Sequence, residues 1–351
     1  MLAARWHGRG DIRVEDIDDL PAPADDWVRV RIEACGLCGT DVEEYEAGPN
    51  IIPTEPHGLT GRCAPLTLGH EAVGVVEDRG RTARLDLGTR VAVESNLFCG
   101  TCWWCVRHEY QLCTTLASLG LMGDGGLAEA MLAPAFMCVP YGDHVPASSA
   151  ALAEPLSVAV RAVGRGQVGL GSTVGILGAG TIGLLATQAA RLAGARTVVV
   201  SERLPERRAL ALALGADAAV APEDVADVAN DLTNGVGVDV AIEAAGNAAA
   251  AAAAIRLARR GGRAVILGVF DADVPIPMMP FLLGEKEVVA SLSHVYDSDF
   301  ATAVSLIDRG QVRVEPLITD RIALGEVVEQ GFKALVAEPQ SHLKVIVTPN
   351  G

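Results

Sequence analysis

Residues 172–202 read STVGILGAGTIGLLATQAARLAGARTVVVSE, and this stretch decides the fold. An apolar run begins at Val174 and meets a GxGxxG pattern, small and apolar residues then recur at helical spacing over 184–192, and a second apolar run covers 197–200. This order of strand, glycine-rich turn, helix and strand is typical of a βαβ unit, whose glycines let a pyrophosphate approach the helix N-terminus. The stretch therefore predicts a dinucleotide-binding Rossmann domain. The expected cofactor-binding residues of its turn are Gly178, Gly180, Thr181, Ile182 and Gly183.

A carboxylate follows the second strand of this unit. Glu202 stands nineteen residues after Gly183, where it can accept a hydrogen bond from a ribose 2′-OH and would repel a 2′-phosphate. NAD is therefore the expected cofactor. Arg203 comes next and would attract that phosphate, so NADP remains the alternative.

The sequence around this unit indicates two domains. The segments VDVAIEAAG (238–246) and AVILGVF (264–270) continue the parallel sheet, and the alanine-rich segment 248–260 between them is predicted to be a crossover helix that ends at the following Gly-Gly. The first ~150 residues hold short β-type segments broken by Gly and Pro. We expect the boundary between the two domains near EPLSVAV (154–160).

Composition narrows the function classes. The net charge is −16, and the 28 Lys and Arg residues are scattered singly or in short pairs, so nucleic acid is not an expected partner. The start, MLAARWHGRGDIRVED, lacks an apolar signal run, and no uninterrupted apolar stretch of about 18 residues occurs. A cytoplasmic protein with no membrane partner is expected.

Half of the eight cysteines are crowded into residues 99–113, CGTCWWCVRHEYQLC. A reducing compartment makes disulfides improbable, which leaves metal or redox chemistry. A redox pair of Cys102 and Cys105 would leave the other two cysteines without a role, whereas four thiolates suit tetrahedral zinc and close its coordination sphere. The segment predicts a structural zinc, and the chemistry must then lie elsewhere. The expected ligands of this zinc are Cys99, Cys102, Cys105 and Cys113.

A second set of candidate ligands is spread over three motifs. GLCGTD supplies Cys38, TLGHE supplies His70 and Glu71, and ALAEPLSVAV supplies Glu154. Each motif alone has a simpler explanation, because a buried cysteine is usually a small core residue and an EP dipeptide often opens a helix. The remaining cysteines are interpreted as ordinary core or loop residues: Cys35, Cys63 and Cys138.

Taken together, in this order and beside a four-cysteine segment, these motifs resemble the zinc-dependent medium-chain alcohol and polyol dehydrogenases over nearly the whole chain. The resemblance implies a catalytic zinc on Cys38, His70 and Glu154, with Glu71 as an outer partner or as a ligand that exchanges with water. It implies a mainly β, GroES-like catalytic domain over 1–156 and 298–351, and a doubly wound Rossmann domain over 157–297. Three mixed ligands would leave a fourth position open, where an alcohol can bind and lose its proton.

The resemblance extends to a substrate class. The segments 3–15, 44–71 and 327–336 are similar to the butanediol dehydrogenase branch, which interconverts acetoin and a vicinal diol. We therefore predict zinc-dependent, NAD-linked interconversion of a secondary alcohol and its ketone, with a small vicinal diol such as 2,3-butanediol as substrate. Five residues after the zinc cysteine that branch usually carries His, and here the residue is Glu43. Some sugar dehydrogenases resemble the chain at this position, so a polyol, sugar or aminocyclitol remains the alternative.

The proton route and the quaternary structure are also expectations. Thr40 is predicted to pass the substrate proton outward to Glu43, although Thr40 could instead cap the following helix and Glu43 could be a solvated side chain. A non-catalytic NAD-binding structural protein is the alternative from another class. The family resemblance implies a homodimer or homotetramer, with EKEVVASLSHV (285–295) as a candidate edge strand for pairing.

Overall fold

The computed structural model describes residues 1–270 and 272–349. The chain divides into two compact units. Unit 1 consists of Met1–Glu154 and Val295–Gly351, and unit 2 consists of Pro155–His294. Within the described ranges, no helix is both long enough and apolar enough to cross a membrane.

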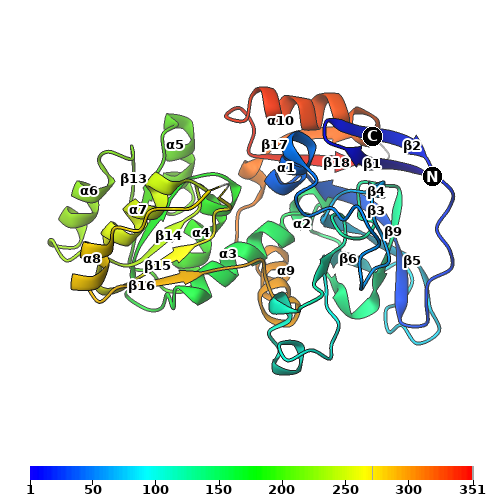
Figure 1. Ribbon diagram of the computed structural model, residues 1–351, viewed down its shortest axis with the longest axis horizontal. Coiled ribbons are helices and arrows are strands. Elements are labelled where there is room, and N and C mark those ends of the chain that lie inside the picture. The colour runs from blue at the N-terminus through cyan, green and yellow to red at the C-terminus, as the bar shows by residue number, and fades with distance from the viewer. Residues whose placement is uncertain (271, 350–351) are drawn as a thin grey trace. The chain divides into compact units, whose positions relative to one another are not determined.

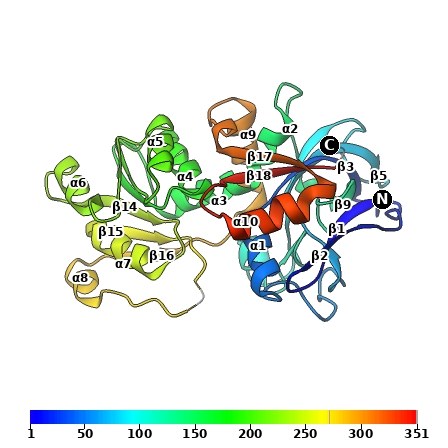
Figure 2. The same ribbon diagram turned by 90° about the horizontal axis from the view of Figure 1, so that it is seen from above.

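Unit 2 is built on a six-stranded parallel sheet in the order β13-β12-β11-β14-β15-β16. This is the order of a doubly wound dinucleotide-binding sheet. Figure 2 shows α4 and α5 on one face of the sheet and α7 and α8 on the other. The strands are β11 (Thr173–Leu177), β12 (Thr197–Ser201), β13 (Ala218–Val220), β14 (Val238–Glu243), β15 (Ala258–Ile266) and β16 (Glu287–Ala290). The helices are α3 (Ala153–Arg165), whose first two residues belong to unit 1, α4 (Thr181–Leu192), α5 (Pro205–Ala213), α6 (Val225–Leu232), α7 (Ala248–Leu257) and α8 (Met278–Leu283).

The βαβ unit expected from the glycine pattern is confirmed. Every residue of β11 is buried, as are Val198, Val199 and Val200 of β12, because these strands lie in the middle of the sheet with helices on both faces. The apolar positions of α4 face the sheet, and Leu184 and Leu185 are fully buried.

The expected crossover helix over 248–260 is too long by three residues. Helix α7 ends at Leu257, and Ala258 leaves the helical region, with φ −59° and ψ 133°. Ala258 pairs with Val238 of β14, and the register then shifts. Pairing with β14 therefore outweighs the helical propensity of this segment, and the arginines that follow belong to β15.

Unit 1 is mainly β (Figure 1). One sheet has the order β10-β6-β5-β3-β18-β17, with β9 also paired to β3, and a second sheet has the order β2-β1-β4. The first strands are β1 (Leu2–Gly8), β2 (Asp11–Asp16), β3 (Trp27–Gly36), β4 (Leu66–Thr67), β5 (Glu71–Arg79) and β6 (Arg90–Val93). The later strands are β7 (Asn96–Leu97), β8 (Ala117–Ser118), β9 (Ala130–Pro134), β10 (Cys138–Pro140), β17 (Ile318–Ala323) and β18 (Lys344–Thr348). The α-helices of this unit are α1 (Gly39–Ala47), α2 (Ala147–Ala150), α9 (Ala301–Asp308) and α10 (Ala334–Ala337).

The C-terminal strand β18 lies inside unit 1, next to β3. Val347 pairs with Cys35 and Ile346 with Gly36 in antiparallel register. The core beneath these strands contains Trp6 and Phe332, which are 2% and 0% exposed. The chain thus brings its last strand to the strand that precedes the Cys38 motif.

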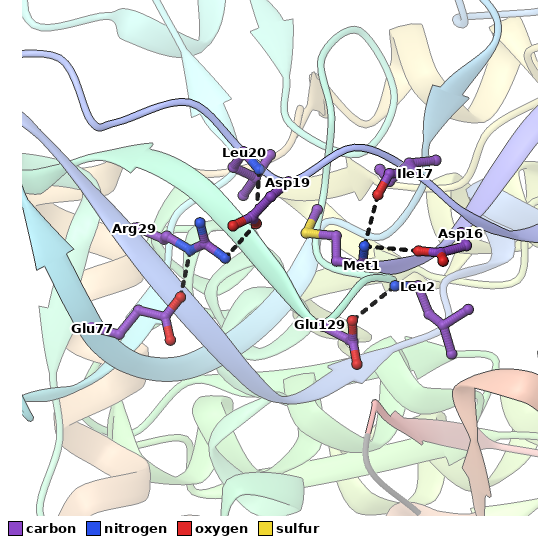
Figure 3. Close-up of polar contacts among 9 residues, drawn as sticks. All are labelled: Met1, Leu2, Asp16, Ile17, Asp19, Leu20, Arg29, Glu77 and Glu129. Carbon is purple, nitrogen blue, oxygen red and sulfur yellow. Dashed lines mark hydrogen bonds and ion pairs between the residues drawn. The ribbon is translucent and has the colours of Figure 1, made fainter.

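The N-terminus of unit 1 is fixed by polar contacts (Figure 3). The Met1 ammonium donates to Asp16 Oδ1 at 2.9 Å and to the Ile17 carbonyl at 2.7 Å. The Leu2 N–H donates to Glu129 Oε2 at 2.8 Å. These contacts hold β1 against the segments on either side of it.

Candidate active site and metal centres

The four thiols of Cys99, Cys102, Cys105 and Cys113 converge, and all four sulfurs lie within 4.8 Å of one another. The Sγ–Sγ distance is 3.5 Å between Cys102 and Cys105 and 3.9 Å between Cys99 and Cys105. These distances are far too long for a disulfide bond. They agree with the separation of about 3.8 Å that four thiolates adopt around a tetrahedral zinc with bonds of about 2.3 Å. The segment is therefore a four-cysteine metal site of the structural type.

The backbone around these sulfurs favours their ionised form. N–H groups of Thr101 and Cys102 lower the pKa of Cys99 to about 5, and N–H groups of Cys105 and Thr114 lower the pKa of Cys102 to about 7. Burial raises the pKa of Cys105 to about 12. Because the thiolate is the metal ligand, the loop prepares two of its sulfurs for a cation.

A second group of donors lies at the end of β3. The ligand atoms of Cys38, His70 and Glu71 all lie within 4.8 Å of one another. Cys38 follows β3 and is the N-cap of α1, while His70 and Glu71 stand where β5 begins. Strands β3 and β5 are antiparallel partners with Gly36 opposite Glu71, so the sheet joins motifs that lie 32 residues apart in the sequence. Gly69, with φ +96°, turns the chain into His70 at a point where an added Cβ would lie 2.7 Å from Leu127.

Asp41 is a residue of this group that the sequence reasoning missed. Its Oδ2 accepts a hydrogen bond from the Cys38 N–H at 2.9 Å, and its Oδ1 lies 3.4 Å from Nδ1 of His70. Asp41 is 0% exposed and His70 is 7% exposed. Burial would lower the pKa of His70, but the charges of Asp41 and Cys38 outweigh it and raise the pKa well above its usual value. Because Nδ1 of His70 faces Asp41, Nε2 is the nitrogen that could bind a metal. This is the common carboxylate–histidine–metal arrangement.

Lys344 is the second residue that sequence reasoning missed. Its ammonium donates to both carboxylate oxygens of Glu71, at 2.6 and 2.8 Å, and to the Leu37 carbonyl at 2.8 Å. The Lys344 side chain is 4% exposed and that of Glu71 is 0% exposed. The only sequence signal was a lysine next to the apolar run of β18, which by itself named no partner.

Glu154 lies in the first turn of α3 and is 8% exposed. Its charge is one of those that raise the pKa of Lys344, which places it near the same cluster. Among the described residues, Glu154 is outside the group whose ligand atoms lie within 4.8 Å of one another.

The residues expected to carry the proton lie on α1. Thr40 is the second residue of this helix and Cys38 is its N-cap, so the alternative in which Thr40 caps the helix is wrong. The Thr40 hydroxyl lies 3.8 Å from the Cys38 sulfur. Glu43 is exposed, whereas its neighbour Glu44 is buried and accepts hydrogen bonds from the backbone N–H groups of residues 50 and 51.

The glycine-rich turn of unit 2 has the geometry that a pyrophosphate requires. Gly178 has φ +103°, Gly180 is the N-cap of α4, and a Cβ added to Gly183 would lie 1.9 Å from the Gly178 carbonyl oxygen. Thr181 and Ile182 form the first turn of α4. The turn therefore presents the N-terminus of α4 at the carboxyl end of β11, where dinucleotides bind in this class of sheet.

Glu202 and Arg203 follow β12 at the same edge. Glu202 Oε2 accepts a hydrogen bond from the Ala179 N–H at 2.8 Å, and Oε1 accepts one from the Leu204 N–H at 2.9 Å. Arg203 is exposed. Arg208 donates to the backbone carbonyls of both residues, at 2.9 and 2.7 Å, and so holds this corner in place.

Comparison with known proteins gives the class. Residues 24–143 match the alcohol dehydrogenase GroES-like domain, and residues 181–309 match the zinc-binding dehydrogenase family. The chain belongs to the zinc-dependent medium-chain dehydrogenases, and it is an oxidoreductase that acts on CH–OH groups. The predicted family and the predicted pairing of a Rossmann domain with a GroES-like domain are confirmed, and the alternative of a non-catalytic structural protein is not retained.

Three relatives bear on substrate and cofactor. The (R,R)-butanediol dehydrogenase of Bacillus subtilis is 34% identical over 100% of both chains. The crystal structure of a 2R,3R-butanediol dehydrogenase from Bacillus subtilis has a TM-score of 0.91, with 32% identity and 99% of each chain covered. L-idonate 5-dehydrogenase of Vitis vinifera is 30% identical over 90% of this chain and 86% of that protein. A zinc-binding dehydrogenase of Sinorhizobium meliloti, solved with NADP, has a TM-score of 0.88 and 34% identity over 99% of each chain.

Proposed function

We propose that this protein interconverts a small vicinal diol, such as 2,3-butanediol, and its hydroxyketone, with NAD as the hydride carrier. The observation that carries the substrate is the full-length likeness to a butanediol dehydrogenase, 34% identical with no part of either chain left over. The enzyme class supplies the reaction type.

The donor set at the end of β3 fits a catalytic zinc. Cys38 offers a thiol, His70 offers Nε2 because its Nδ1 faces Asp41, and Glu154 offers a carboxylate on the first turn of α3. When bound, zinc acts as a Lewis acid that lowers the pKa of an alcohol and leaves one position for it. The role of the chain here is to orient these donors and to keep the imidazole in one tautomer.

The proton route proposed for the reaction follows α1. Thr40 is half-buried and lies beside the Cys38 sulfur, so its hydroxyl is in place to receive the substrate proton. Glu43 is three residues further on and therefore shares a face of the helix with Thr40. Because Glu43 is exposed, it stands where the proton leaves for water.

The turn at β11 and α4 is proposed to hold NAD. Glu202 stands at the end of β12 with its carboxylate on the glycine-rich turn, the position from which such a group accepts from ribose hydroxyls. The exposed Arg203 is the feature that favours NADP as the alternative.

The structural and catalytic donor groups imply two zinc ions per chain. They are separate groups of residues: the four sulfurs of Cys99, Cys102, Cys105 and Cys113 lie together, and so do the ligand atoms of Cys38, His70 and Glu71. All eight cysteines are free thiols, which is typical of a reducing compartment and supports the expected cytoplasmic location.

The experiment that tests the proposal is a substrate panel. Purified protein is given NAD and, separately, vicinal diols, polyols, sugars, cyclitols and L-threonine, with NADH formation followed by its absorbance. We expect the highest kcat/KM for a short vicinal diol, and acetoin with NADH should run the reverse reaction. No turnover of any short diol, with turnover of a sugar or polyol, would reject the proposed substrate.

A polyol or sugar acid is the second candidate substrate, and one specific observation favours it. Glu43 stands where the butanediol branch usually has His, and a relative that spans 90% of this chain is an L-idonate dehydrogenase. The same panel, with L-idonate added, separates the two candidates, because sorbitol is already among its polyols.

We also propose that two copies of the chain associate through unit 2. Strand β16 is the edge of the six-stranded sheet, and α8 beside it exposes apolar side chains. Met279 is 67% exposed, Leu282 64% and Leu283 65%. An open edge next to an apolar helix suits a second copy of the same strand. Light scattering should give at least a dimer, and Leu282→Asp should shift the mass toward the monomer.

A further inference from the structure

Lys344 is a buried cation paired with Glu71, whose ligand oxygen lies close to the ligand atoms of Cys38 and His70. It opens β18, which lies beside β3, and this pairing brings its ammonium to the end of β3. All three partners of the ammonium are oxygens of the chain: both carboxylate oxygens of Glu71 and the carbonyl of Leu37. Since the side chains of Lys344 and Glu71 are 4% and 0% exposed, water does not screen this ion pair.

The charges around Lys344 explain why a lysine is stable there. Burial would lower the pKa of Lys344, but Glu71, Cys38 and Glu154 together outweigh burial and raise the pKa. Lys344 therefore stays positive among three potential anions. Removing it would leave Glu71 as a buried carboxylate without a cation, an unfavourable state that a neighbouring metal would relieve.

Glu71 is close enough to the other donors to become a metal ligand. Its nearest oxygen lies within 4.8 Å of the ligand atoms of Cys38 and His70. Yet both of its oxygens are occupied by Lys344. Gly36 makes this orientation possible, because an added Cβ at Gly36 would lie 1.9 Å from Glu71 Oε2. Lys344 thus holds the carboxylate toward β18, and the missing side chain at Gly36 leaves the room that this orientation needs.

A fourth protein ligand would close the site. Structural zinc sites have four protein ligands, whereas catalytic zinc sites keep one position for water or substrate. We infer that Lys344 is a positioning residue that holds Glu71 off the catalytic metal and thereby keeps the substrate position open. This inference rests on the proposed ligand set of Cys38, His70 and Glu154.

The test uses cobalt as a visible probe of coordination. Protein is loaded with Co²⁺ at both sites, and the difference spectrum against Cys38→Ser removes the contribution of the four-cysteine site. In the wild type, added imidazole should occupy the open position and shift the visible bands. In Lys344→Met, Glu71 should turn to the metal, so the bands should change before any addition. The apparent Kd for imidazole should then rise roughly tenfold or more. In a separate measurement on the zinc-loaded protein, a chromophoric chelator should remove zinc more slowly from Lys344→Met than from the wild type, by a similar factor.

Three further variants make the result specific. Lys344→Met/Glu71→Gln removes the competing carboxylate and should restore the wild-type spectrum and imidazole response, and Lys344→Arg should resemble the wild type. Lys286→Met is the matched control, since the Lys286 ammonium also donates to oxygens of the chain, two backbone carbonyls at 2.7 and 3.0 Å, but lies in unit 2. It should change neither readout.

Two outcomes would overturn the inference. The first is a Lys344→Met protein with the wild-type spectrum, imidazole response and zinc release. The second is a changed spectrum in Glu71→Gln alone, which would make Glu71 a ligand already; this variant also covers the case in which Lys344→Met does not fold. If instead the proposed ligand set of Cys38, His70 and Glu154 is wrong, Glu154→Gln should leave the cobalt spectrum unchanged. This result distinguishes a wrong ligand set from a wrong role for Lys344.

Discussion

Asp41 Oδ1 lies 3.4 Å from His70 Nδ1, and among the described residues neither atom has a hydrogen-bond partner. Both side chains are buried. Two buried polar atoms without hydrogen-bond partners lower the stability of the fold, unless the contact between them shortens to a hydrogen bond. Nε2 of His70 would hold a metal, and Nδ1 would then keep its proton and donate it to Asp41. The two buried atoms without hydrogen-bond partners therefore support a metal site at His70.

Asp41→Asn should weaken zinc at this site. The amide keeps the shape of the side chain but no longer supplies a negative charge to the imidazole, and changes of this kind typically cost roughly ten- to a hundredfold in metal affinity, about 1.4 to 2.7 kcal/mol. Chelator competition measures the affinity directly. Asp320→Asn is the matched control, because Asp320 accepts from His342 Nδ1 at 2.7 Å and, among the described residues, neither belongs to a group of clustered candidate ligands. Equal zinc affinity in the Asp41 variant and the control would mean that Asp41 only accepts the hydrogen bond from the Cys38 N–H and does not affect the metal.

Metal content should be two zinc ions per chain. Cys102→Ser should lower the thermal midpoint and the soluble yield, because the loop of 99–113 depends on the metal for its order. Cys38→Ser should stay folded, bind NAD and lose turnover. Elemental analysis is the measurement, with the half-buried Cys63→Ser as a control that keeps both ions. A single zinc per fully active chain contradicts the two-site interpretation.

Cofactor preference should depend on Glu202. The wild type should have much higher kcat/KM with NAD than with NADP. Glu202→Ala removes hydrogen bonds to a charged group, worth about 1.5–3 kcal/mol, so kcat/KM with NAD should fall roughly ten- to a hundredfold while that with NADP does not. Glu206→Ala, an exposed change in the next helix, is the control. Equal use of both cofactors by the wild type would show that Arg203 decides the preference.

The fold could be predicted from the sequence because its signals are local. The glycine pattern, the flanking apolar runs and the cysteine spacing each lie within about thirty residues, and each dictates one structural unit. The end of α7 was missed because pairing of Ala258 with β14 decides it, and strand pairing is not local.

The site was predictable only in part, for the same reason. Cys38 and His70 carry their own motifs, and Asp41, three residues from Cys38 in the same motif, was within reach of the sequence. Lys344 was not, since 273 positions separate it from Glu71 and only the sheet brings them together. A lysine at the start of an apolar strand indicates that it has an ion-pair partner, but the sequence does not identify that partner.

Glu43 is the position where this chain leaves the butanediol pattern, and Glu43→Gln tests it. Two interpretations compete: a solvated side chain on α1, or the outer base of a relay that starts at Thr40. The amide keeps the shape and removes the base. If the relay operates, alcohol oxidation near pH 7 should fall roughly ten- to a hundredfold, below the full range of general-base catalysis because water and hydroxide can substitute.

The pH profile separates the two interpretations. Hydroxide becomes a better substitute for the missing base as the pH rises, so the deficit of Glu43→Gln should shrink steadily between about pH 6 and 10. A change in packing or folding would instead lower kcat/KM by the same factor at every pH. Glu46→Gln, another exposed glutamate of α1, is the control and should follow the wild type throughout. If the profiles of Glu43→Gln and the wild type superimpose, the proton does not leave through Glu43, and the exposed carboxylate has no part in the reaction.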